Sequence, residues 1–444
     1  MQYKVQIHNY VQNHKDEIVE TLKELIKIPS VRSEAEENAP FGKECARLLR
    51  LIEQLYKDNG FETELDSNGG YLLSYYGKGE KTLGIFAHAD VVSVGDDWVL
   101  CKPFEPLEKD GCLIGRGTLD DKSAVVISLY CAKFLKELNI PFDRRLIMFT
   151  GSNEESGMED IKNYISTHTP PDFSLVCDTG FPVYRGDKGV LRFIATSPFA
   201  LKEIDDFRGG NAFNIILGKA SAEYKNQVLT EKGISKHGAL PEGSVNAGYL
   251  LSEKLLKEAL CKEDKEQIKF VADTLEKYYG EVFGIENSDP VFGRLTCTNG
   301  IIDTNDQKLS LCFDMRYGMS VNIEDVKSKI IKYFAENGWS VEFVKQQSPF
   351  CVSEDNPYLL ACLEAYKSFT GAKNATAYIN AGGTYASHLP CAVEIGPTLK
   401  GGRVEGMPQG HGGAHQPDEC ISIDGLLDAI ELTSLMLLEC DKIW

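Results

Sequence analysis

The sequence predicts an α/β domain with a mostly parallel central sheet, into which a second domain of α+β type is inserted. Three apolar runs at 82–87, 145–150 and 173–178 are separated by helical segments, which is typical of buried parallel strands. The pattern changes after about residue 188, because residues 308–317 alternate apolar and polar side chains. Such alternation predicts an antiparallel strand with one wet face.

Helices are expected before and between these strands. Two amphipathic helices precede the first strand, and a largely apolar helix at 122–138 is expected to pack on the sheet. Their apolar positions recur at helical spacing, at Ile18, Leu22, Leu25 and Ile26 in the first helix and at Leu48, Leu51, Ile52 and Leu55 in the second.

The segment 188–380 contains a different set of elements. A strand is expected at 190–197 and helices at 246–259, 264–280 and 323–337. Motif-rich sequence returns after residue 380, so we expect 188–380 to be a domain inserted into one made of 1–187 and 381–444.

Composition excludes several classes of protein. The net charge of -19 argues against a nucleic-acid partner, since phosphates would be repelled. The 13 cysteines include no CxxC pair, which argues against a disulfide framework or a zinc-finger cage. The chain shows neither a membrane-spanning apolar run nor a signal-peptide core, so we expect a cytoplasmic protein with no membrane partner.

Polar side chains gather where the predicted parallel strands end. Because ligands of open α/β sheets bind beyond the carboxyl ends of the strands, these residues are expected to converge at one edge. Imidazole and carboxylate groups are ligands for divalent metal, and a pair of ions would offset the clustered negative charge and activate a water molecule. The residues are His88 with Asp90, Glu154 with Glu155, Asp178, and Asp120 with Asp121 in the loop before the 122–138 helix.

Two further features suit such a site. One of two adjacent glutamates can ligate metal while the other takes a proton from the water. A second histidine would give each ion a nitrogen ligand, and GHGGAHQPDE at 410–419 offers His411 and His415. Each feature alone is usually a turn or a solvated surface, so the inference depends on their order and their strand context.

Five motifs in this order resemble a known metallopeptidase family. They are HADVV followed by GDDW, GRGTLDDKSA, SNEESG, CDTG and HQPDE. The family includes carboxypeptidase G, succinyl-diaminopimelate desuccinylase and acetylornithine deacetylase, and the nearest resemblance is to PepV-type bacterial dipeptidases. It implies a zinc-peptidase-like α/β catalytic domain, 1–187 and 381–444, and an inserted lid domain, 188–380.

The resemblance also implies a ligand set for two divalent ions. His88 and Asp178 would hold one ion, and Glu155 and His415 the other. Asp120 would bridge both, and the peptide bond after it is typically cis in this family. The ions would be Zn²⁺, with Mn²⁺ and Co²⁺ also suited to these ligands.

Catalytic roles are implied for three other residues. Glu154 would be the general base, and Asp90 would orient His88 without touching metal. His237, in KHGALPEGSVNA, would reach from the lid to stabilise the oxyanion of the tetrahedral intermediate. A loop histidine before a helix is its ordinary interpretation.

Substrate contacts are implied at two places. Asn214 in GGNAFNII resembles a lid asparagine that supports the substrate or the transition state. Arg316 resembles the arginine that binds the substrate carboxylate, assisted by Gly382, Gly383 and Thr384 of AGGTYASH. A turn residue and a solvated strand arginine are the respective ordinary interpretations.

One departure concerns the residue after GGTYA. PepV-type dipeptidases usually carry arginine there, whereas this chain has Ser387, followed by His388. The exchange removes the positive charge that the usual arginine supplies at this position.

The function implied by the resemblance is that of a dinuclear metal dipeptidase acting as a monomer. A metal-bridging hydroxide would attack unblocked dipeptides, including β-alanyl dipeptides such as carnosine. One alternative is an N-acyl amino acid amidohydrolase, whose relatives usually have shorter lids. Another is an inactive binding protein, but all five candidate ligands and Glu154 are present.

Overall fold

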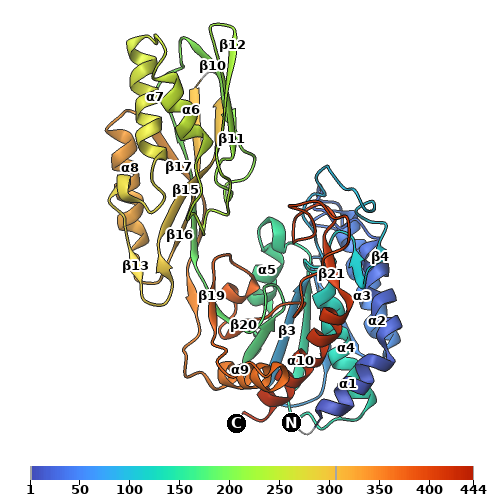
Figure 1. Cartoon of the computed structure of the whole chain (residues 1–444). Helices are drawn as coiled ribbons and strands as arrows, with labels where there is room; N and C mark the ends of the chain where they lie inside the picture. Colours follow the sequence, from blue (N-terminus) through green and yellow to red (C-terminus); the bar gives the residue numbers. More distant parts are fainter. Residues whose placement is uncertain (1–2, 306–307, 444) are drawn as a thin grey trace. The chain divides into compact units, whose positions relative to one another are not determined.

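The computed structural model describes residues 3–305 and 308–443, which form two compact units. The first unit contains Met1–Gly186, Cys351–Asn380 and Thr384–Trp444, and the second contains Asp187–Phe350 with Ala381–Gly383. Figure 1 shows both units coloured along the chain. The assignment of one part of the chain as a catalytic domain and of the other as a lid stays a prediction. The units differ from the predicted domains because the first unit includes residues 351–380, which the sequence analysis placed in the inserted segment.

The first unit is built around a mixed sheet with strand order β1-β2-β6-β3-β7-β20-β8-β18 and with β19 paired to β8. The neighbours β6, β3 and β7 run parallel, as the three apolar runs predicted, and β20, which was not predicted, is parallel to β7. The pairs β1–β2, β2–β6 and β20–β8 are antiparallel, so the sheet is less uniformly parallel than expected. The strands are β1 Glu62–Leu65, β2 Tyr71–Tyr76, β3 Thr82–His88, β6 Arg145–Gly151, β7 Phe173–Val176, β8 Tyr184–Asp187, β18 Phe350–Cys351, β19 Tyr378–Asn380 and β20 Ala392–Glu394.

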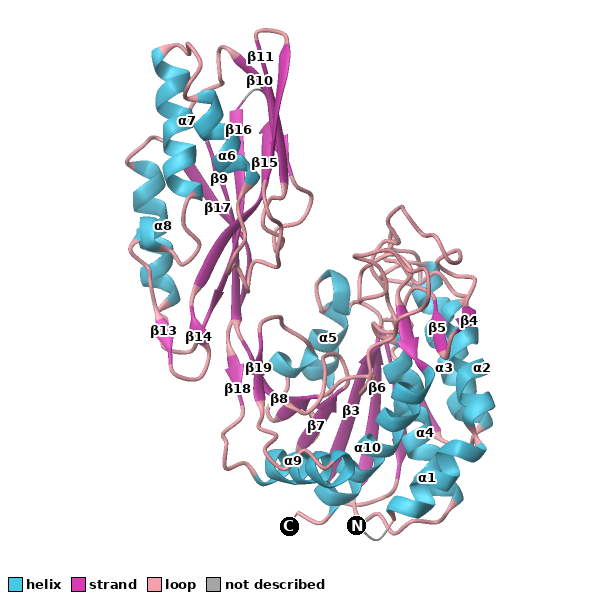
Figure 2. Cartoon of the chain, viewed as in Figure 1, coloured by secondary structure: helices cyan, strands magenta, loops and turns pink. Residues whose placement is uncertain are grey.

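Helices lie on both sides of this sheet (Figure 2). Tyr164 of α5 packs against the rings of Phe86 and Phe149, which are register partners in β3 and β6. Helix α4 begins at Lys122, directly after the DD pair, and is buried along almost its whole length. The helices are α1 Lys4–Asn13, α2 Lys15–Ile26, α3 Lys43–Asp58, α4 Lys122–Glu137, α5 Glu159–Thr167, α9 Pro357–Thr370 and α10 Ile423–Asp441.

Helix α9 belongs to the first unit because its apolar side packs on α10. Leu359 and Cys362 are buried, and the thiol of Cys362 lies 3.6 Å from that of Cys440 in α10. Asn356 caps the start of α9, where Pro357 is the first helical residue.

A small sheet joins two distant motifs of the first unit. Its order is β21-β5-β4, with β4 Leu107–Lys109, β5 Cys112–Ile114 and β21 Cys420–Ser422. Cys420 pairs with Ile114, so the loop that follows β5 lies beside the residues that precede β21. This pairing brings GRGTLDD next to HQPDE.

The second unit is an antiparallel sheet of order β12-β11-β10-β15-β16-β9-β17 with α6, α7 and α8 along one face (Figure 1). The predicted apolar face of 308–317 is confirmed, since Leu309, Leu311, Phe313 and Met315 all belong to the core on the helical side. The predicted wet face is wrong, because Cys312, Asp314 and Arg316 on the other side of the strand are also buried. The elements are β9 Gly189–Thr196, β10 Ile204–Gly209, β11 Lys219–Tyr224, β12 Gln227–Lys232, β15 Thr296–Asn305, β16 Lys308–Tyr317, β17 Ser340–Gln347, α6 Ala247–Leu255, α7 Lys262–Leu275 and α8 Ile323–Ala335, with a two-stranded sheet of β13 Ser288–Asp289 and β14 Gly293–Arg294.

No helix among the described residues is both long and apolar enough to cross a membrane.

Candidate active site

Three neighbouring parallel strands deliver their polar side chains to one edge of the first unit's sheet. His88 is the last residue of β3 and pairs in register with Gly151 at the end of β6. Glu154 and Glu155 follow β6 in a short 3-10 turn, Glu154–Ser156. Asp178 comes two residues after β7 ends. The prediction that these segments meet at the carboxyl ends of the strands is confirmed.

The other two predicted ligands arrive through the pairing of β5 with β21. Asp120 lies in the loop between β5 and α4, and the peptide bond that joins it to Asp121 is cis. His415 lies in the loop before β21, with a positive φ of 65°. The Asp121 carboxylate accepts a hydrogen bond from the backbone N–H of His88, 3.2 Å away, which ties the loop to the end of β3.

Asp120 stands between the two histidines. Its Oδ1 lies 3.0 Å from Nε2 of His88, and its Oδ2 lies 2.9 Å from Nε2 of His415. Nε2 of His88 is also 3.7 Å from Asp178 Oδ1, and Nε2 of His415 is 3.0 Å from Glu155 Oε1. All five predicted ligands therefore meet, as two groups that share one carboxylate.

The donor atoms of this cluster fit a metal ion. Nε2 of His88 and Oδ1 of Asp120 are both sealed from solvent, yet within the described residues neither has a partner with acceptable hydrogen-bond geometry. Such orphaned buried atoms are costly unless a ligand satisfies them. Ligating atoms of His88, Asp120 and Glu155 lie within 4.8 Å of one another, as do those of His88, Glu154 and Asp178.

Asp90 organises both the first histidine and the glutamate pair. Nδ1 of His88 lies 2.9 Å from the backbone oxygen of Asp90 and donates to it, which leaves Nε2 free to ligate. The Asp90 carboxylate accepts from the backbone N–H groups of Glu154, at 3.1 Å, and Glu155, at 3.2 Å. Asp90 thus acts on His88 mainly through its main chain.

Charge repulsion and burial shift the titration of this cluster. Burial, followed by the charge of Asp178, raises the pKa of Glu154 well above its ordinary value. Hydrogen bonds to Asp120 and Glu155 raise the pKa of His415 to about 11. Burial lowers the pKa of His88, but the nearby carboxylates outweigh it and raise that pKa. The cluster therefore attracts positive charge strongly, whether protons or metal ions.

Two buried carboxylates of HQPDE, Asp418 and Glu419, support the site but were not predicted as site residues from the sequence. Oε1 of Glu419 accepts from the backbone N–H groups of Gly117, Leu119 and Asp120 at 2.9–3.1 Å, and its other oxygen pairs with Arg116. Asp418 accepts from the backbone N–H groups of Val99 and Leu100, and from Nδ1 of His411 at 2.7 Å. Their main-chain donors lie about 300 residues earlier in the chain, so no local sequence pattern indicated these contacts.

Asp160 is a third missed residue. Its Oδ2 accepts from the backbone N–H groups of Ser152 and Asn153, both at 2.7 Å, and from the hydroxyl of Tyr385. Tyr385 belongs to the GGTYA segment and packs edge-on against the ring of His88. The tyrosine of this segment therefore supports the loop that presents Glu154.

The remaining predicted site residues lie in the second unit, except Thr384. Nδ2 of Asn214 is 3.4 Å from Nε2 of His237, and Nη1 of Arg316 donates to the backbone oxygen of Ala381 at 2.8 Å. That bond brings Arg316 to the segment containing Gly382 and Gly383. A Cβ at Gly383 would meet the side-chain amide of Gln347, so that side chain would have to move.

Thr384 belongs to the first unit and caps the short helix Tyr385–His388. Its hydroxyl accepts from the N–H of Ala386 at 3.2 Å and donates to the buried carboxylate of Glu394. The hydroxyl is thus engaged with the protein, and its predicted role toward substrate stays a prediction.

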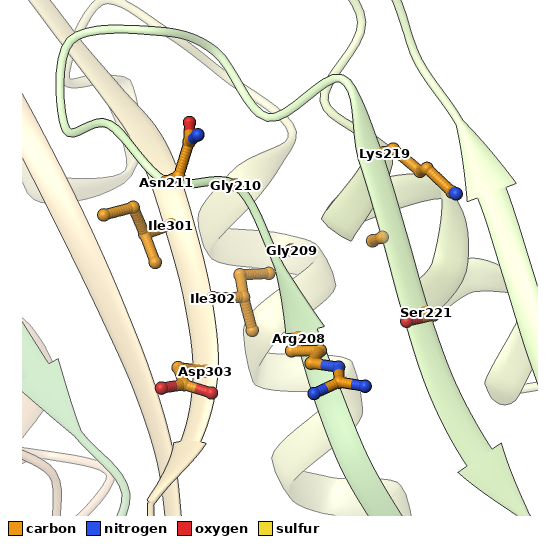
Figure 3. A pocket seen from close by; sticks show the side chains of 10 residues that line it. Arg208, Gly209, Gly210, Asn211, Lys219, Ser221, Ile301, Ile302 and Asp303 are labelled. Atoms are coloured by element: carbon orange, nitrogen blue, oxygen red, sulfur yellow. The ribbon is translucent and has the colours of Figure 1, made fainter. Parts of the chain in front are cut away.

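A hollow of the second unit lies apart from these residues. It has a volume of about 580 Å³ and is lined by β10, β11 and β15 (Figure 3). Arg208, Lys219 and Asp303 are its charged residues, and none of the predicted site residues lines it. Arg208 is well exposed and pairs with Asp206.

Comparisons with known proteins agree with this geometry. A protein of Staphylococcus epidermidis named "Putative dipeptidase" is 29% identical over 428 residues, covering 87% of this chain and 90% of that protein. Human carnosine dipeptidase 1 shares the fold with a TM-score of 0.63 and 15% identity, over 99% of this chain and 100% of the other. The Bacillus subtilis YXEP protein, described as a dinuclear metal binding peptidase, has a TM-score of 0.56 at 11% identity, over 97% and 100%.

The family model settles the assignment that the five motifs suggested. The model for peptidase family M20/M25/M40 matches residues 84–439, from the third strand of the first unit through most of its last helix. The match thus contains every residue assigned above to the candidate metal centre. The chain belongs to peptidase family M20/M25/M40 and is a hydrolase of peptide bonds.

Proposed function

We propose that this peptidase is a dipeptidase that uses two divalent metal ions, preferably Zn²⁺, to cleave unblocked dipeptides. We also propose that it acts as a monomer in the cytoplasm. The observation that carries the proposal is the position of Asp120, whose two oxygens face the Nε2 atoms of two different histidines at 3.0 and 2.9 Å. A carboxylate placed in this way suits two ions that share one ligand. The relative from Staphylococcus epidermidis supports the substrate class.

Each ion would take one histidine and one carboxylate of its own. His88 and Asp178 would hold the first, Glu155 and His415 the second, and Asp120 both. When bound, such ions polarise a carbonyl group and lower the pKa of a water molecule. Mn²⁺ and Co²⁺ suit the same nitrogen and oxygen donors.

Glu154 is the proposed general base. Its carboxyl group is buried beside Asp178, which raises its pKa, and its backbone is fixed by Asp90. A base with a raised pKa can take a proton from the attacking water and pass it to the leaving amine. Glu154 would therefore carry the proton between the two halves of the reaction.

His237 is the proposed donor to the oxyanion. The backbone N–H of Ala239 donates to its Nδ1 at 3.3 Å, which favours the neutral tautomer with its hydrogen on Nε2. Burial, followed by the charge of Arg316, lowers the pKa of His237, which favours that neutral form. The Asn214 side chain beside Nε2 would support the same oxygen or the substrate.

Arg316 and the adjoining Gly382–Gly383 backbone, with Thr384, are proposed to bind the free carboxylate of the substrate. Recognition of both ends of the peptide would restrict cleavage to dipeptides, and a β-alanyl dipeptide such as carnosine also has two free ends. An N-acyl amino acid lacks the free amino group, so it should not be cleaved.

A panel of substrates tests this function. Amine release is measured from free dipeptides, carnosine, tripeptides, and N-acetyl and N-succinyl amino acids, with and without added Zn²⁺ or Mn²⁺. We expect hydrolysis only of dipeptides, with at least about a 100-fold loss after chelation, because the metal supplies much of the rate enhancement. Hydrolysis of the acylated amino acids alone would establish the amidohydrolase alternative instead.

Metal stoichiometry tests the shared carboxylate. The native chain should bind two ions, His415→Ala should retain one, and Asp120→Ala should lose both, because only Asp120 contributes to each group. Elemental analysis of the purified proteins after dialysis gives the number of ions. His168→Ala changes a histidine of the first unit that lies outside the cluster. This variant is the control and should keep two metal ions. One ion in the native chain would contradict a dinuclear site.

A further inference from the structure

A buried carboxylate in the second unit is held between two arginines. Asp314 of β16 has no exposed surface and lies directly across from Arg192 of β9 in the sheet register. Its Oδ2 accepts from Nε of Arg192 at 2.9 Å and from Nη2 of Arg316 at 3.1 Å. Its Oδ1 accepts from Nε of Arg316 at 2.6 Å.

The hydrophobic core does not require this triad. Phe313 and Met315 point into the core beneath the helices, so the alternation of the strand places Asp314 and Arg316 on the opposite face. A buried ion triad is seldom more stabilising than well-packed apolar residues would be. The presence of the triad therefore favours a role in positioning a charged side chain rather than in stabilising the sheet.

The hydrogen bonds of Arg316 define the direction in which its guanidinium can act. Of its five N–H groups, two go to Asp314 and one goes to the backbone oxygen of Ala381. Within residues 3–305 and 308–443, these bonds leave one N–H on each terminal nitrogen. When the bond to Ala381 uses the inner N–H of Nη1, the two outer N–H groups that remain are parallel and can bind a carboxylate through both of its oxygens.

We propose that Asp314 is a positioning residue that holds Arg316 so that this outer pair of N–H groups selects substrates with a free terminal carboxylate, an inference that rests on the proposed function. Arg192 holds Asp314 from the other side and stacks on the ring of Phe213, the neighbour of Asn214. The second unit thus joins the carboxylate-binding arginine to the segment of the proposed oxyanion residues.

The test uses the metal-loaded full chain and two matched substrates, a dipeptide and the same dipeptide with its carboxylate converted to an amide. In the native enzyme the carboxylate should be strongly preferred. Asp314→Asn should raise the KM for the dipeptide at least about 10-fold with kcat within about 3-fold, and should leave the amide nearly unchanged, because only carboxylate binding depends on Arg316. The preference for acid over amide should fall about 10-fold.

Two more variants keep the test decisive if Asp314→Asn folds poorly. Arg192→Gln removes the other partner of Asp314 and should reduce the same preference, by about 3-fold. Asp314→Glu, which retains the charge, should restore part of the preference relative to Asp314→Asn. Arg208→Gln, in the hollow of Figure 3, is the control and should leave KM and kcat unchanged for both substrates.

The possible outcomes separate the inference from the function on which it rests. If Asp314→Asn and Arg192→Gln lose the same fraction of activity toward the dipeptide and toward its amide, the role of Asp314 is purely structural and the inference is overturned. A native enzyme that cleaves dipeptides without preferring the acid over the amide would also overturn it. A native enzyme that cleaves no dipeptide would instead refute the proposed function itself.

Discussion

Glu154→Gln is expected to slow dipeptide hydrolysis by about 100- to 10,000-fold while both metal ions remain bound. The amide cannot take a proton from water, and the proposed ligands His88, Asp120, Glu155, Asp178 and His415 are untouched by the change. The substitution also keeps the volume of the side chain, and the backbone bond from Glu154 to Asp90 stays in place. The loss should therefore appear in kcat, with KM little changed.

The measurements are the steady-state rate and the metal content of the same sample. Glu155→Gln is the informative comparison, because Glu155 lies 3.0 Å from Nε2 of His415 and is proposed to hold an ion. That variant should lose metal as well as activity. Glu159→Gln, on an exposed side chain of the same segment, should behave like the native enzyme. If the Glu154 variant loses metal while the Glu155 variant retains it, the roles of the two glutamates are reversed.

The parts of the site that the sequence predicts are those in which strand and ligand are adjacent in the chain. His88 directly follows an apolar run, and Glu154 lies four residues beyond the end of another. Parallel neighbours must end at the same edge of a sheet, so the strand pattern was enough to bring these side chains together. Short strands gave no such signal, and β8 and β20 were not identified.

The supporting residues could not be found in this way because their partners are remote and lie on the main chain. Glu419 accepts from backbone N–H groups about 300 residues earlier, and an N–H donor leaves no trace in a sequence. Asp314 was likewise hidden, since a carboxylate on the polar side of an alternating strand is usually solvated. The structure buries it between two arginines instead.

Glu419→Ala is expected to destabilise the first unit and to weaken metal binding together. Glu419 is fully buried, and its partner Arg116 is only 1% exposed, so the alanine variant leaves an unpaired buried charge. Breaking such a pair costs about 3–5 kcal/mol, which corresponds to a fall in the midpoint of thermal unfolding of roughly 10 °C. Three backbone N–H groups, including that of Asp120, also lose their acceptor.

The second effect distinguishes this carboxylate from an ordinary core residue. The N–H groups that it binds belong to the loop that presents Asp120 to both histidines, so loosening the loop should weaken both ions. Thermal unfolding is measured with and without Zn²⁺, together with the affinity for Zn²⁺, which we expect to fall about 10- to 100-fold. Glu405→Ala, an exposed acid of the same C-terminal segment, should shift neither quantity. An unfolding midpoint that falls while the metal affinity stays native would mean that Glu419 supports the fold and not the position of Asp120.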